Sequence, residues 1–317
     1  MLSEIFYREL ADCGGYSSAV DSVDCVIQQQ TGESFGEKWT VYSKENEAAQ
    51  KRYYEMQKRW YLELYGFDSE ASLGEYLRSC SVVLDAGCGL GHKSAWFAEM
   101  APDTTIIGMD ISSSIEVASE RYGGYENLHF VKGDIADTGI HSGAVDYVSC
   151  DQVLHHTTDP GITFDELASL LSPDGEFACY VYRKKAIPRE LLDTYFREEC
   201  MNLTKEELWE FSKQMTELGR VLSGLDAKIN VPDIPALGIE GGEYDLQRFL
   251  YWNFFKCYWN EELGEESSVM INFDWYSPAK ADRYSREEFM EMAERNFLKA
   301  LYFHTEPACY SGRFGKI

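Results

Sequence analysis

The sequence has few basic residues, no long hydrophobic run and no closely spaced pair of cysteines. Lysine and arginine number 29 against 54 aspartates and glutamates, so the chain of 317 residues carries a formal net charge of −25. A chain this acidic is repelled by phosphate backbones, which counts against nucleic acid as a main partner. Its apolar runs fall far short of the roughly 18–20 residues that a membrane span needs, so we expect no membrane partner.

The cysteines are scattered along the chain. There are nine of them, an odd number, and none forms a CxxC pair. Such thiols are typical of a reduced, cytoplasmic protein without a disulfide framework. They also lack the spacing of zinc ligands, so we expect no bound metal. The first ten residues, MLSEIFYREL, have no basic start before an apolar block, and we expect no secretory signal there.

Strands and helices alternate along much of the chain. Short apolar runs at residues 82–85 and 105–110 read as buried strands, and each is followed by a segment with helical spacing. This alternation predicts a doubly wound, mostly parallel sheet covered by helices on both faces. A hydrophobic fraction of 44% is sufficient for the core that such a sheet requires.

The alternation stops after the fifth expected strand and resumes near residue 284. Residues 188–225 read as helices, and residues 244–260 read as one helix that is apolar on nearly all sides. We expect this insertion to be a substrate lid or half of a homodimer interface. The expected parts are an N-terminal extension over the binding site at residues 1–77, a sheet domain at 78–185 and 284–317, and a mainly helical insertion at 186–283.

Polar side chains follow the ends of four consecutive expected strands. The first strand runs into a glycine-rich loop, DAGCGLG at residues 85–91, and the next two end at Asp110 and Asp134. The fourth ends at Asp151 and Gln152. Because the carboxyl ends of parallel strands share one edge of a sheet, we expect these groups to meet at one cleft. There, Asp110 suits the vicinal hydroxyls of a ribose, and Asp134 suits an adenine amino group.

The spacing of the glycines separates two kinds of ligand. A dinucleotide fingerprint needs glycine at the third position of G-x-G-x-x-G, which follows Gly87 and Gly89 and is His92 here. The pattern therefore suits a ligand without a pyrophosphate. For the loop taken alone, a turn with incidental glycines is the alternative interpretation.

Five stretches together resemble the class I S-adenosylmethionine-dependent methyltransferases: VLDAGCGLG, IIGMDISSS, FVKGDI, VDYVSCDQVLHHTTDP and LSPDGEF. The resemblance covers about residues 78–183 and 284–317. It implies an α/β fold with a seven-stranded sheet whose last strand is antiparallel, and S-adenosylmethionine as the cofactor. The implied cofactor residues are Asp85, Gly87, Cys88, Gly89 and Gly91 for the methionine part, Asp110 and Ile111 for the ribose, Asp134 and Ile135 for the adenine, and Asp151 and Gln152 along the cofactor.

Two further pieces, FGEKW and VLHHTTDP, are similar to a subgroup that methylates small molecules. In that subgroup the N-terminal segment lies over the cofactor, which makes Trp39 and Tyr42 pocket candidates. The alternative is that Trp39 packs in the core.

Methyl transfer from a sulfonium needs no acid, because the leaving group is a neutral thioether. The site must mainly align the acceptor with the methyl group. A hydroxyl or ammonium acceptor must also lose a proton, and His155, His156 and Asp151 are the candidate bases. Packing or a backbone hydrogen bond is the alternative for each histidine, and we expect the two adjacent rings to point in different directions.

The insertion is the region expected to bind the acceptor. Its aromatic residues suit either a core or a pocket for a planar ligand. Three cations, Arg248, Lys256 and Arg313, suit a carboxylate or phosphate of the acceptor, with ordinary salt bridges as the alternative. The candidate substrate residues are Arg248, Trp252, Asn272, Trp275, Tyr276 and Arg313.

The sequence therefore predicts an enzyme that methylates a small molecule, such as a natural product, a sugar or a lipid-like metabolite. The alternatives are methyl transfer to protein or tRNA, cofactor binding without turnover, and a nicotinamide-dependent oxidoreductase. The acidic balance counts against tRNA, and His92 counts against the oxidoreductase. The acceptor atom is not determined by the sequence.

Overall fold

The computed structural model describes residues 2–19, 30, 32 and 47–317, which form two compact units. Unit 1 comprises Met1–Arg183 and Lys280–Ile317, and unit 2 comprises Lys184–Ala279. The pocket candidates Trp39 and Tyr42 lie outside the described residues. No helix in the described ranges is long and apolar enough to cross a membrane.

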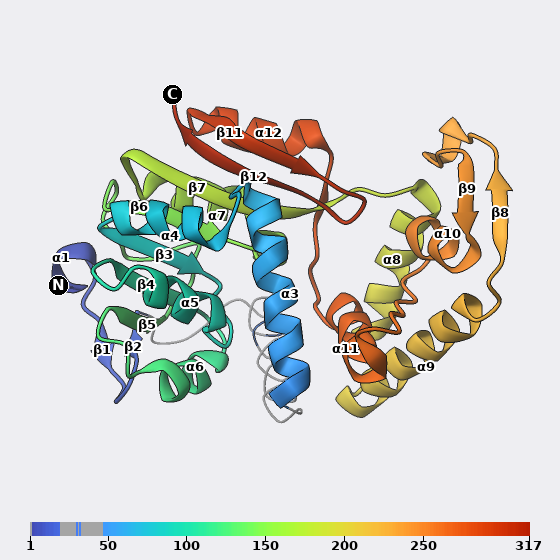
Figure 1. Cartoon of the computed structure of the whole chain (residues 1–317), viewed down its shortest axis with the longest axis horizontal. Helices are drawn as coiled ribbons and strands as arrows, with labels where there is room; N and C mark the ends of the chain where they lie inside the picture. Colours follow the sequence, from blue (N-terminus) through green and yellow to red (C-terminus); the bar gives the residue numbers. More distant parts are fainter. Residues whose placement is uncertain (1, 20–29, 31, 33–46) are drawn as a thin grey trace. The chain divides into compact units, whose positions relative to one another are not determined.

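A central sheet runs through unit 1 with the strand order β1-β2-β5-β4-β3-β6-β7-β12-β11, and β10 pairs with β7 (Figure 1). The ladders from β2 to β7 are parallel, whereas β12 is antiparallel to both β7 and β11. The prediction of a mostly parallel sheet with an antiparallel last strand is confirmed. The strands are β1 (Ala11–Asp12), β2 (Ser17–Ser18), β3 (Val82–Ala86), β4 (Thr105–Asp110), β5 (Leu128–Lys132), β6 (Val145–Cys150), β7 (Leu171–Arg183), β10 (Arg283–Tyr284), β11 (Leu298–Thr305) and β12 (Cys309–Lys316).

The predicted number of seven strands is wrong, because the sheet of the described residues has ten. The three additional strands, β1, β2 and β10, are each two residues long. Such short strands pair through their backbones alone, so they leave no alternating pattern of side chains in the sequence.

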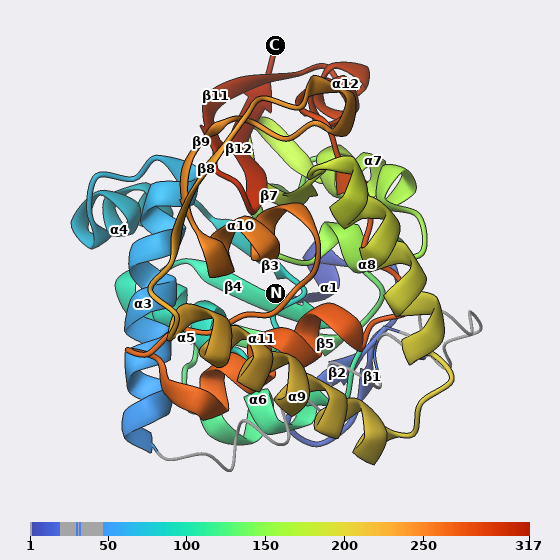
Figure 2. The same ribbon diagram turned by 90° about the vertical axis from the view of Figure 1, so that its right-hand side faces the viewer.

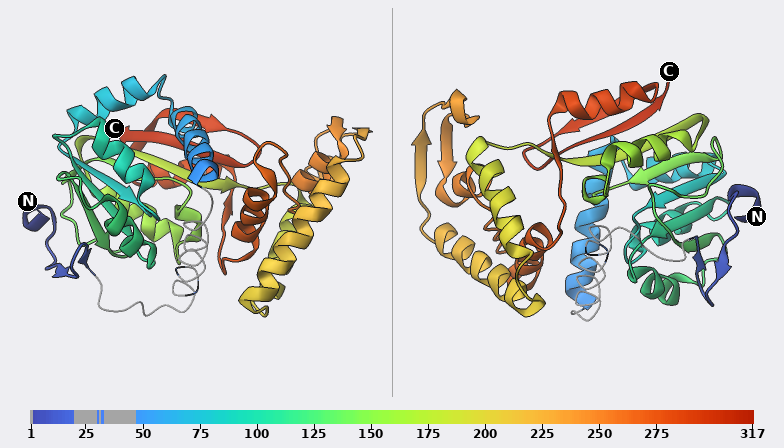
Figure 3. Two further views of the ribbon diagram at one scale, coloured as in Figure 1. Left: turned by 60° about the horizontal axis from the view of Figure 1, so that its bottom comes forward. Right: turned by 180° about the vertical axis from the view of Figure 1, so that it is seen from behind.

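Helices cover both faces of this sheet (Figures 1 and 3). Successive residues of a strand point to opposite faces, so Val83 joins the apolar cluster beneath α3, α4 and α5, and Leu84 joins the cluster beneath α7 and α12. The long helix α3 is tied to the antiparallel end of the sheet, because Ser311 Oγ donates to the Leu64 carbonyl at 2.8 Å. The helices of unit 1 are α1 (Leu2–Ile5), α3 (Glu47–Tyr65), α4 (Glu70–Ser79), α5 (His92–Met100), α6 (Ser114–Tyr122), the short η1 (Leu154–His156), α7 (Pro160–Ser169) and α12 (Arg286–Arg295).

Unit 2 is mainly helical and has one small antiparallel hairpin of β8 and β9 (Figure 2). Helices α9 and α11 pack face to face, and the rings of Trp209 and Phe273 stack with centroids 3.9 Å apart. The elements are α8 (Ile187–Cys200), α9 (Lys205–Ser223), β8 (Lys228–Val231), the short η2 (Pro235–Leu237), β9 (Gly242–Asp245), α10 (Leu246–Asn253) and α11 (Gly264–Tyr276).

The prediction of one helix over residues 244–260 is wrong. Helix α10 ends at Asn253 and α11 begins at Gly264, and side chains bind the backbone between them. Gln247 Nε2 donates to the Cys257 carbonyl at 2.8 Å, and the Tyr258 amide donates to Asn272 Oδ1 at 2.8 Å. These hydrogen bonds take the place of helical backbone bonds in the segment of residues 254–263, which connects α10 to α11. This connecting segment therefore folds back against α9 and α11.

Gly219 allows this segment to approach α9 closely. A Cβ at this position would lie 2.4 Å from the Cys257 carbonyl oxygen. Helix propensity alone predicts that Gly219→Ala stabilises the protein by about 1 kcal/mol. We expect the opposite, a loss of about 1–2 kcal/mol, because overpacking must displace backbone. Urea denaturation of the two proteins measures the sign.

Gly224→Ala is the matched control, because a Cβ there meets its nearest atom at 3.5 Å. We expect this change to alter the free energy of unfolding by less than about 0.5 kcal/mol. Stabilisation by Gly219→Ala would contradict the close contact of α9 with residue 257.

Candidate active site

The glycine-rich loop connects the end of β3 to α5 at the carboxyl edge of the sheet. The amides of Gly87 and Cys88 donate to the Met109 carbonyl at 2.8 and 3.0 Å, which ties the loop to β4. Gly87 has φ +78°, and a Cβ there would lie 2.4 Å from Val153. Gly91 has φ +74°, and a Cβ there would lie 2.7 Å from Phe130. Neighbouring side chains and positive φ values therefore require these two glycines, whether or not a ligand approaches them.

Asp110, the last residue of the neighbouring strand β4, binds the glycine-rich loop. Its Oδ2 accepts a hydrogen bond from the Gly89 amide at 2.8 Å, and its Oδ1 accepts bonds from the amide and hydroxyl of Ser112 at 2.8 and 2.6 Å. A carboxylate has about four acceptor positions. While Ser112 keeps both bonds, about one position is left for a ligand hydroxyl. The partly exposed Ile111 follows Asp110 directly.

Asp134 follows β5 in a tight turn. Its Oδ1 accepts a hydrogen bond from the Ala136 amide at 2.9 Å, and Ile135 between them is buried. Among the described residues, no hydrogen bond is made to its Oδ2. This oxygen is therefore available to accept a bond from an amino group.

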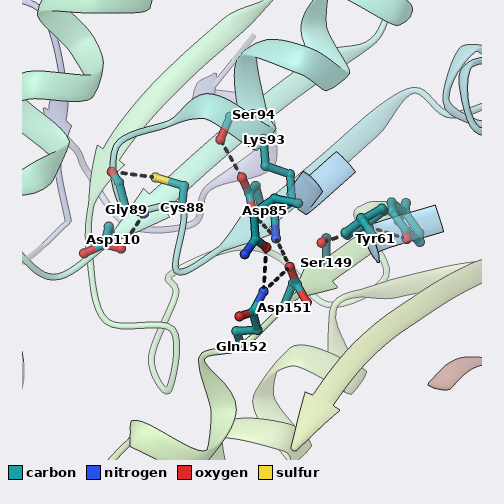
Figure 4. A network of polar contacts seen from close by, with 12 residues as sticks. Tyr61, Asp85, Cys88, Gly89, Lys93, Ser94, Asp110, Ser149, Asp151 and Gln152 are labelled. Atoms are coloured by element: carbon teal, nitrogen blue, oxygen red, sulfur yellow. Dashed lines mark hydrogen bonds and ion pairs between the residues drawn. The ribbon is translucent and has the colours of Figure 1, made fainter. Parts of the chain in front are cut away.

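Asp85 lies at the end of β3, fully buried, and both of its oxygens have partners inside the protein (Figure 4). Ser94 Oγ donates to Oδ2 at 2.6 Å, and Lys93 Nζ lies 3.0 Å from Oδ1. Both partners come from the first turn of α5. Asp85 therefore fixes the start of α5 through its two partners.

Burial raises the pKa of Asp85 above its usual value, although the ammonium of Lys93 and the hydroxyl of Ser94 oppose this. Burial acts to lower the pKa of Lys93, but the carboxylates of Asp85 and Asp151 outweigh it and raise that pKa overall. We take the pair as ionised at neutral pH, because the ammonium has two carboxylates beside it.

Lys93 also connects Asp85 to the end of β6, where Asp151 lies (Figure 4). Its Nζ is 3.8 Å from Asp151 Oδ2, and Tyr65 of α3 donates its hydroxyl to Asp151 Oδ1 at 2.8 Å. Burial, together with this carboxylate, raises the pKa of Tyr65 well above its ordinary value, so Tyr65 stays a donor. Asp85, Lys93 and Asp151 together carry one net negative charge.

Gln152 follows with a backbone conformation that is rare outside glycine, at φ +62°. Its Nε2 donates to Gln57 Oε1 of α3 at 3.1 Å and to Asp151 Oδ2 at 3.3 Å. Lys93, Tyr65 and Gln57 are not among the site residues predicted from the sequence. No spacing rule connects α3 with the end of β6, so the pattern of the sequence contains no signal for this meeting.

The two adjacent histidines lie side by side in η1, contrary to the prediction that their rings diverge. The ring centroids are 4.2 Å apart, and the ring of His155 also lies 3.8 Å from that of Tyr182. His156 Nδ1 lies 2.7 Å from the Lys280 carbonyl, and a carbonyl only accepts, so Nδ1 carries the proton. Both side chains are buried. These contacts are those of packing residues that hold the returning chain, and we leave both histidines out of the proposed reaction.

Arg313 lies in the middle of β12, opposite Ala178 of β7. Its Nε lies 3.0 Å from Glu176 Oε2, and its guanidinium lies 4.3 Å from the centre of the Phe67 ring. These are the contacts of an ordinary ion pair within the sheet domain. We therefore do not include Arg313 among the substrate residues.

The other candidate substrate residues lie in unit 2. Asn272 is fully buried and donates to Thr216 Oγ1 at 2.8 Å, and Tyr276 donates its hydroxyl to the Lys256 carbonyl at 2.7 Å. Trp252 packs edge-on against Tyr251. Trp275 donates its indole Nε1 to Asp193 Oδ1 at 2.9 Å, and the guanidinium carbon of Arg248 lies 5.6 Å from the centre of the Tyr251 ring.

Comparison with known proteins identifies a family that matches the part of the chain containing the carboxyl edge of the sheet. Residues 77–224 match the family described as "Methyltransferase domain". The matched region, which is slightly less than half of the chain, is therefore similar to a methyltransferase domain. Asp85, the glycine-rich loop, Asp110, Asp134 and Asp151 all lie within the matched residues.

Two curated proteins that are similar to part of this chain have names that state an activity. The malonyl-[acyl-carrier protein] O-methyltransferase of Legionella pneumophila is 33% identical over 94 residues, which are 29% of this chain and 33% of that protein. The demethylmenaquinone methyltransferase of Staphylococcus aureus is 25% identical over 125 residues, 38% of this chain and 52% of that protein. The chain thus spans a quarter to about half of the length of the curated relatives it matches.

Among solved structures, PKMT2 from Rickettsia typhi in complex with AdoHcy has a TM-score of 0.51 at 16% identity. The match covers 78% of this chain and 54% of that one. At this identity the likeness shows the fold alone.

The residues at the carboxyl edge fit S-adenosylmethionine. Asp110 keeps an acceptor position for a ribose hydroxyl, and Asp134 keeps one for an amino group, as derived above. The network of Asp85, Lys93 and Asp151 has one net negative charge, which suits a ligand with a sulfonium cation. Within the described ranges, no group of three His, Cys, Asp or Glu side chains is arranged to hold a metal ion.

Lys93→Met is expected to lower the free energy of unfolding by about 3–5 kcal/mol at pH 7, because it leaves a buried carboxylate without its cation. The loss should shrink as the pH falls. Burial already raises the pKa of Asp85, and without Lys93 the folded protein binds this proton still more tightly than the unfolded chain. Urea denaturation at pH 7 and pH 5 measures the effect.

Lys213→Met is the matched control, since Lys213 is exposed and lies 3.9 Å from Glu210. This change should cost less than about 1 kcal/mol at both pH values. The double variant Asp85→Asn/Lys93→Met should recover part of the loss. An equal loss at both pH values for Lys93→Met would show that Asp85 is not the group left uncompensated.

Proposed function

We propose that this chain transfers a methyl group from S-adenosylmethionine to a small-molecule acceptor. The observation that carries the proposal is the row of Asp85, the glycine-rich loop, Asp110 and Asp134 at successive strand ends within the matched methyltransferase domain. The names of two relatives, which state methyl transfer to malonyl-[acyl-carrier protein] and to demethylmenaquinone, support the small-molecule class.

The cofactor supplies a methyl group on a sulfonium, and the chain holds and orients the cofactor. In the proposal, the loop from Gly87 to Gly91, with Cys88, lies along the methionine part. Asp110 and Ile111 bind the ribose, and Asp134 and Ile135 bind the adenine. Asp85 acts through Lys93 and Ser94, because both of its oxygens are already bound within the protein.

Asp151 is the candidate base that the geometry favours. It lies at the strand end next to Asp85, and Tyr65 and Lys93 fix the orientation of its carboxylate. With Gln152, it lines the methyl end of the cofactor in the proposal. Alignment is expected to supply most of the rate enhancement, since the leaving group needs no proton.

The proposal also includes the cellular compartment, the exclusion of nucleic acid as the acceptor, and the oligomeric state. Eight cysteines of the described residues are free, which suits a reducing compartment such as the cytoplasm. The net charge of −25 counts against nucleic acid as the acceptor. Formation of a homodimer through residues 186–283 stays a prediction.

Titration calorimetry with S-adenosylmethionine tests the cofactor. We expect Asp110→Ala to weaken binding by at least tenfold, because hydrogen bonds to a charged group contribute about 1.5–3 kcal/mol. Asp103→Ala is the matched control, an exposed aspartate near the opposite end of the same strand, and should bind as the wild type does. Equal affinities of the two variants would contradict the assigned ribose contact.

The acceptor class needs a second experiment. The protein is incubated with S-adenosylmethionine carrying a labelled methyl group and, separately, with small-molecule, protein and RNA fractions of a cell extract. We expect label in the small-molecule fraction with wild-type protein and none with Asp110→Ala. Label in the protein or RNA fraction would move the assignment to that class, and intact binding without label would indicate a protein that binds without turnover.

A further inference from the structure

The described residues include three non-glycine positions with a positive φ, which are Gln152, Asp226 and Phe297. Asp226 and Phe297 lie within three residues of the ends of α9 and α12, where a left-handed residue commonly terminates a helix. Gln152 instead follows strand β6, which ends at Cys150. A left-handed conformation at such a residue costs free energy, and conformations of this kind cluster at functional sites. The conformation of Gln152 therefore points to a role for this residue.

The turn at Gln152 places the next residue against the glycine-rich loop. The side chain of Val153 fills the space beside Gly87, because a Cβ there would lie 2.4 Å from it. The Val153 carbonyl accepts the His156 amide at 2.9 Å, which joins the turn to η1. Gln152 thus connects the end of β6 to a residue that packs on the loop.

The side chain of Gln152 lies beside Asp151 (Figure 4). Its Nε2 is 3.3 Å from Asp151 Oδ2 and 3.1 Å from Gln57 Oε1. A carboxylate only accepts hydrogen bonds, so the group of Gln152 that faces Asp151 is the NH₂ group. The same nitrogen donates its second hydrogen to Gln57, which therefore presents its oxygen. Gln152 must donate both bonds, whereas Gln57 needs only to accept one.

Helix α3 holds Gln57 in place through two tyrosines. Gln57, Tyr61 and Tyr65 follow one another at intervals of four residues, so they share one face of α3. The hydroxyl of the buried Tyr61 lies 3.0 Å from Ser149 Oγ of β6, and Tyr65 donates its hydroxyl to Asp151 Oδ1 at 2.8 Å. The face of α3 that contains Gln57 is thus fixed against β6 and the residue that follows it.

We propose that Gln57 and Gln152 are positioning residues, which hold the Asp151 carboxylate at the reacting end of the cofactor. The amide of Gln152 restrains the carboxylate directly, and its left-handed turn keeps Val153 on the glycine-rich loop. The proposal rests on the proposed function, because it takes Asp151 to lie beside the sulfonium of S-adenosylmethionine. A charged group stabilises a nearby opposite charge most effectively when it is held in place beforehand.

Two isosteric variants test the pairing of the amides without any cofactor. Gln57→Glu keeps an acceptor for Gln152, whereas Gln152→Glu removes the donor and places a second carboxylate beside Asp151. Both variants change the net charge equally. At pH 7, urea denaturation should therefore give an equilibrium constant for unfolding at least tenfold larger for Gln152→Glu than for Gln57→Glu.

Titration calorimetry of the full chain with S-adenosylmethionine and S-adenosylhomocysteine tests the positioning. S-adenosylhomocysteine has a neutral thioether in place of the sulfonium, so the ratio of the two affinities reports on negative charge held beside the sulfur. We expect Gln152→Met, which keeps the length of the side chain but loses its donor, to lower this ratio at least threefold. Replacement of a residue that only stabilises the fold would weaken both affinities equally.

Gln247→Met is the matched control, because Gln247 is a buried glutamine of unit 2 that donates to the Cys257 carbonyl at 2.8 Å. It should keep the wild-type ratio of affinities. Gln57→Met is a second variant, in case Gln152→Met does not fold, and it should also lower the ratio. Gln57→Glu keeps the acceptor and should not lower it.

The results separate the positioning role from the proposed function. If the wild type binds both ligands and the folded methionine variants at positions 57 and 152 keep its ratio, the positioning role is wrong and the proposed function stands. An equal fall in Gln247→Met, or equal unfolding constants for the two glutamate variants, would also overturn the positioning role. Wild-type protein that binds neither ligand would contradict the proposed function itself, and the positioning role would fall with it.

Discussion

The buried ion pair of Asp85 and Lys93 is the contact on which the carboxyl edge of the sheet depends. A fully buried carboxylate is stable only when its desolvation is offset, and here a cation and a hydroxyl from the first turn of α5 provide the offset. The same cation reaches Asp151, which Tyr65 of α3 also holds. This ion pair thus links β3, α5, β6 and α3. It fixes the positions of the glycine-rich loop, of the strand ends and of Asp151, the candidate base.

The large pattern of unit 1 could be predicted from the sequence, because it arises from local periodicity. Apolar runs that end in Asp110 or Asp134, followed by helical spacing, identify strands buried on both faces and give the order of elements along the chain. The two-residue strands β1, β2 and β10 could not be predicted, since their pairing is a backbone property of the folded sheet. The break between α10 and α11 was missed for a related reason: Gln247 and Asn272 bind that segment from distant positions.

The candidate site shows the same division between local and distant contacts. Its aspartates could be predicted because each follows a strand, and parallel strands bring their ends together. The partners Lys93, Tyr65 and Gln57 could not, because their meeting depends on how α3 and α5 pack. Gly87 and Gly91 were predicted as part of a cofactor loop. The structure adds a second physical reason for them that the sequence does not reveal, because Val153 and Phe130 occupy the space that a side chain would need.

The distribution of charge provides a separate argument about unit 2. With 29 basic residues against 54 acidic ones, a chain of this composition can pair its cations with carboxylates at little cost. Unit 2 places four cations around Trp275, and Asp193 accepts hydrogen bonds from Arg189 and from the Trp275 indole. Burial of these groups has a desolvation cost, which the face of the indole and the hydrogen-bonded carboxylate of Asp193 partly offset. Asp193 of α8 and the indole of α11 therefore fix each other in place, so the contact between these two helices depends on polar groups as well as on apolar packing.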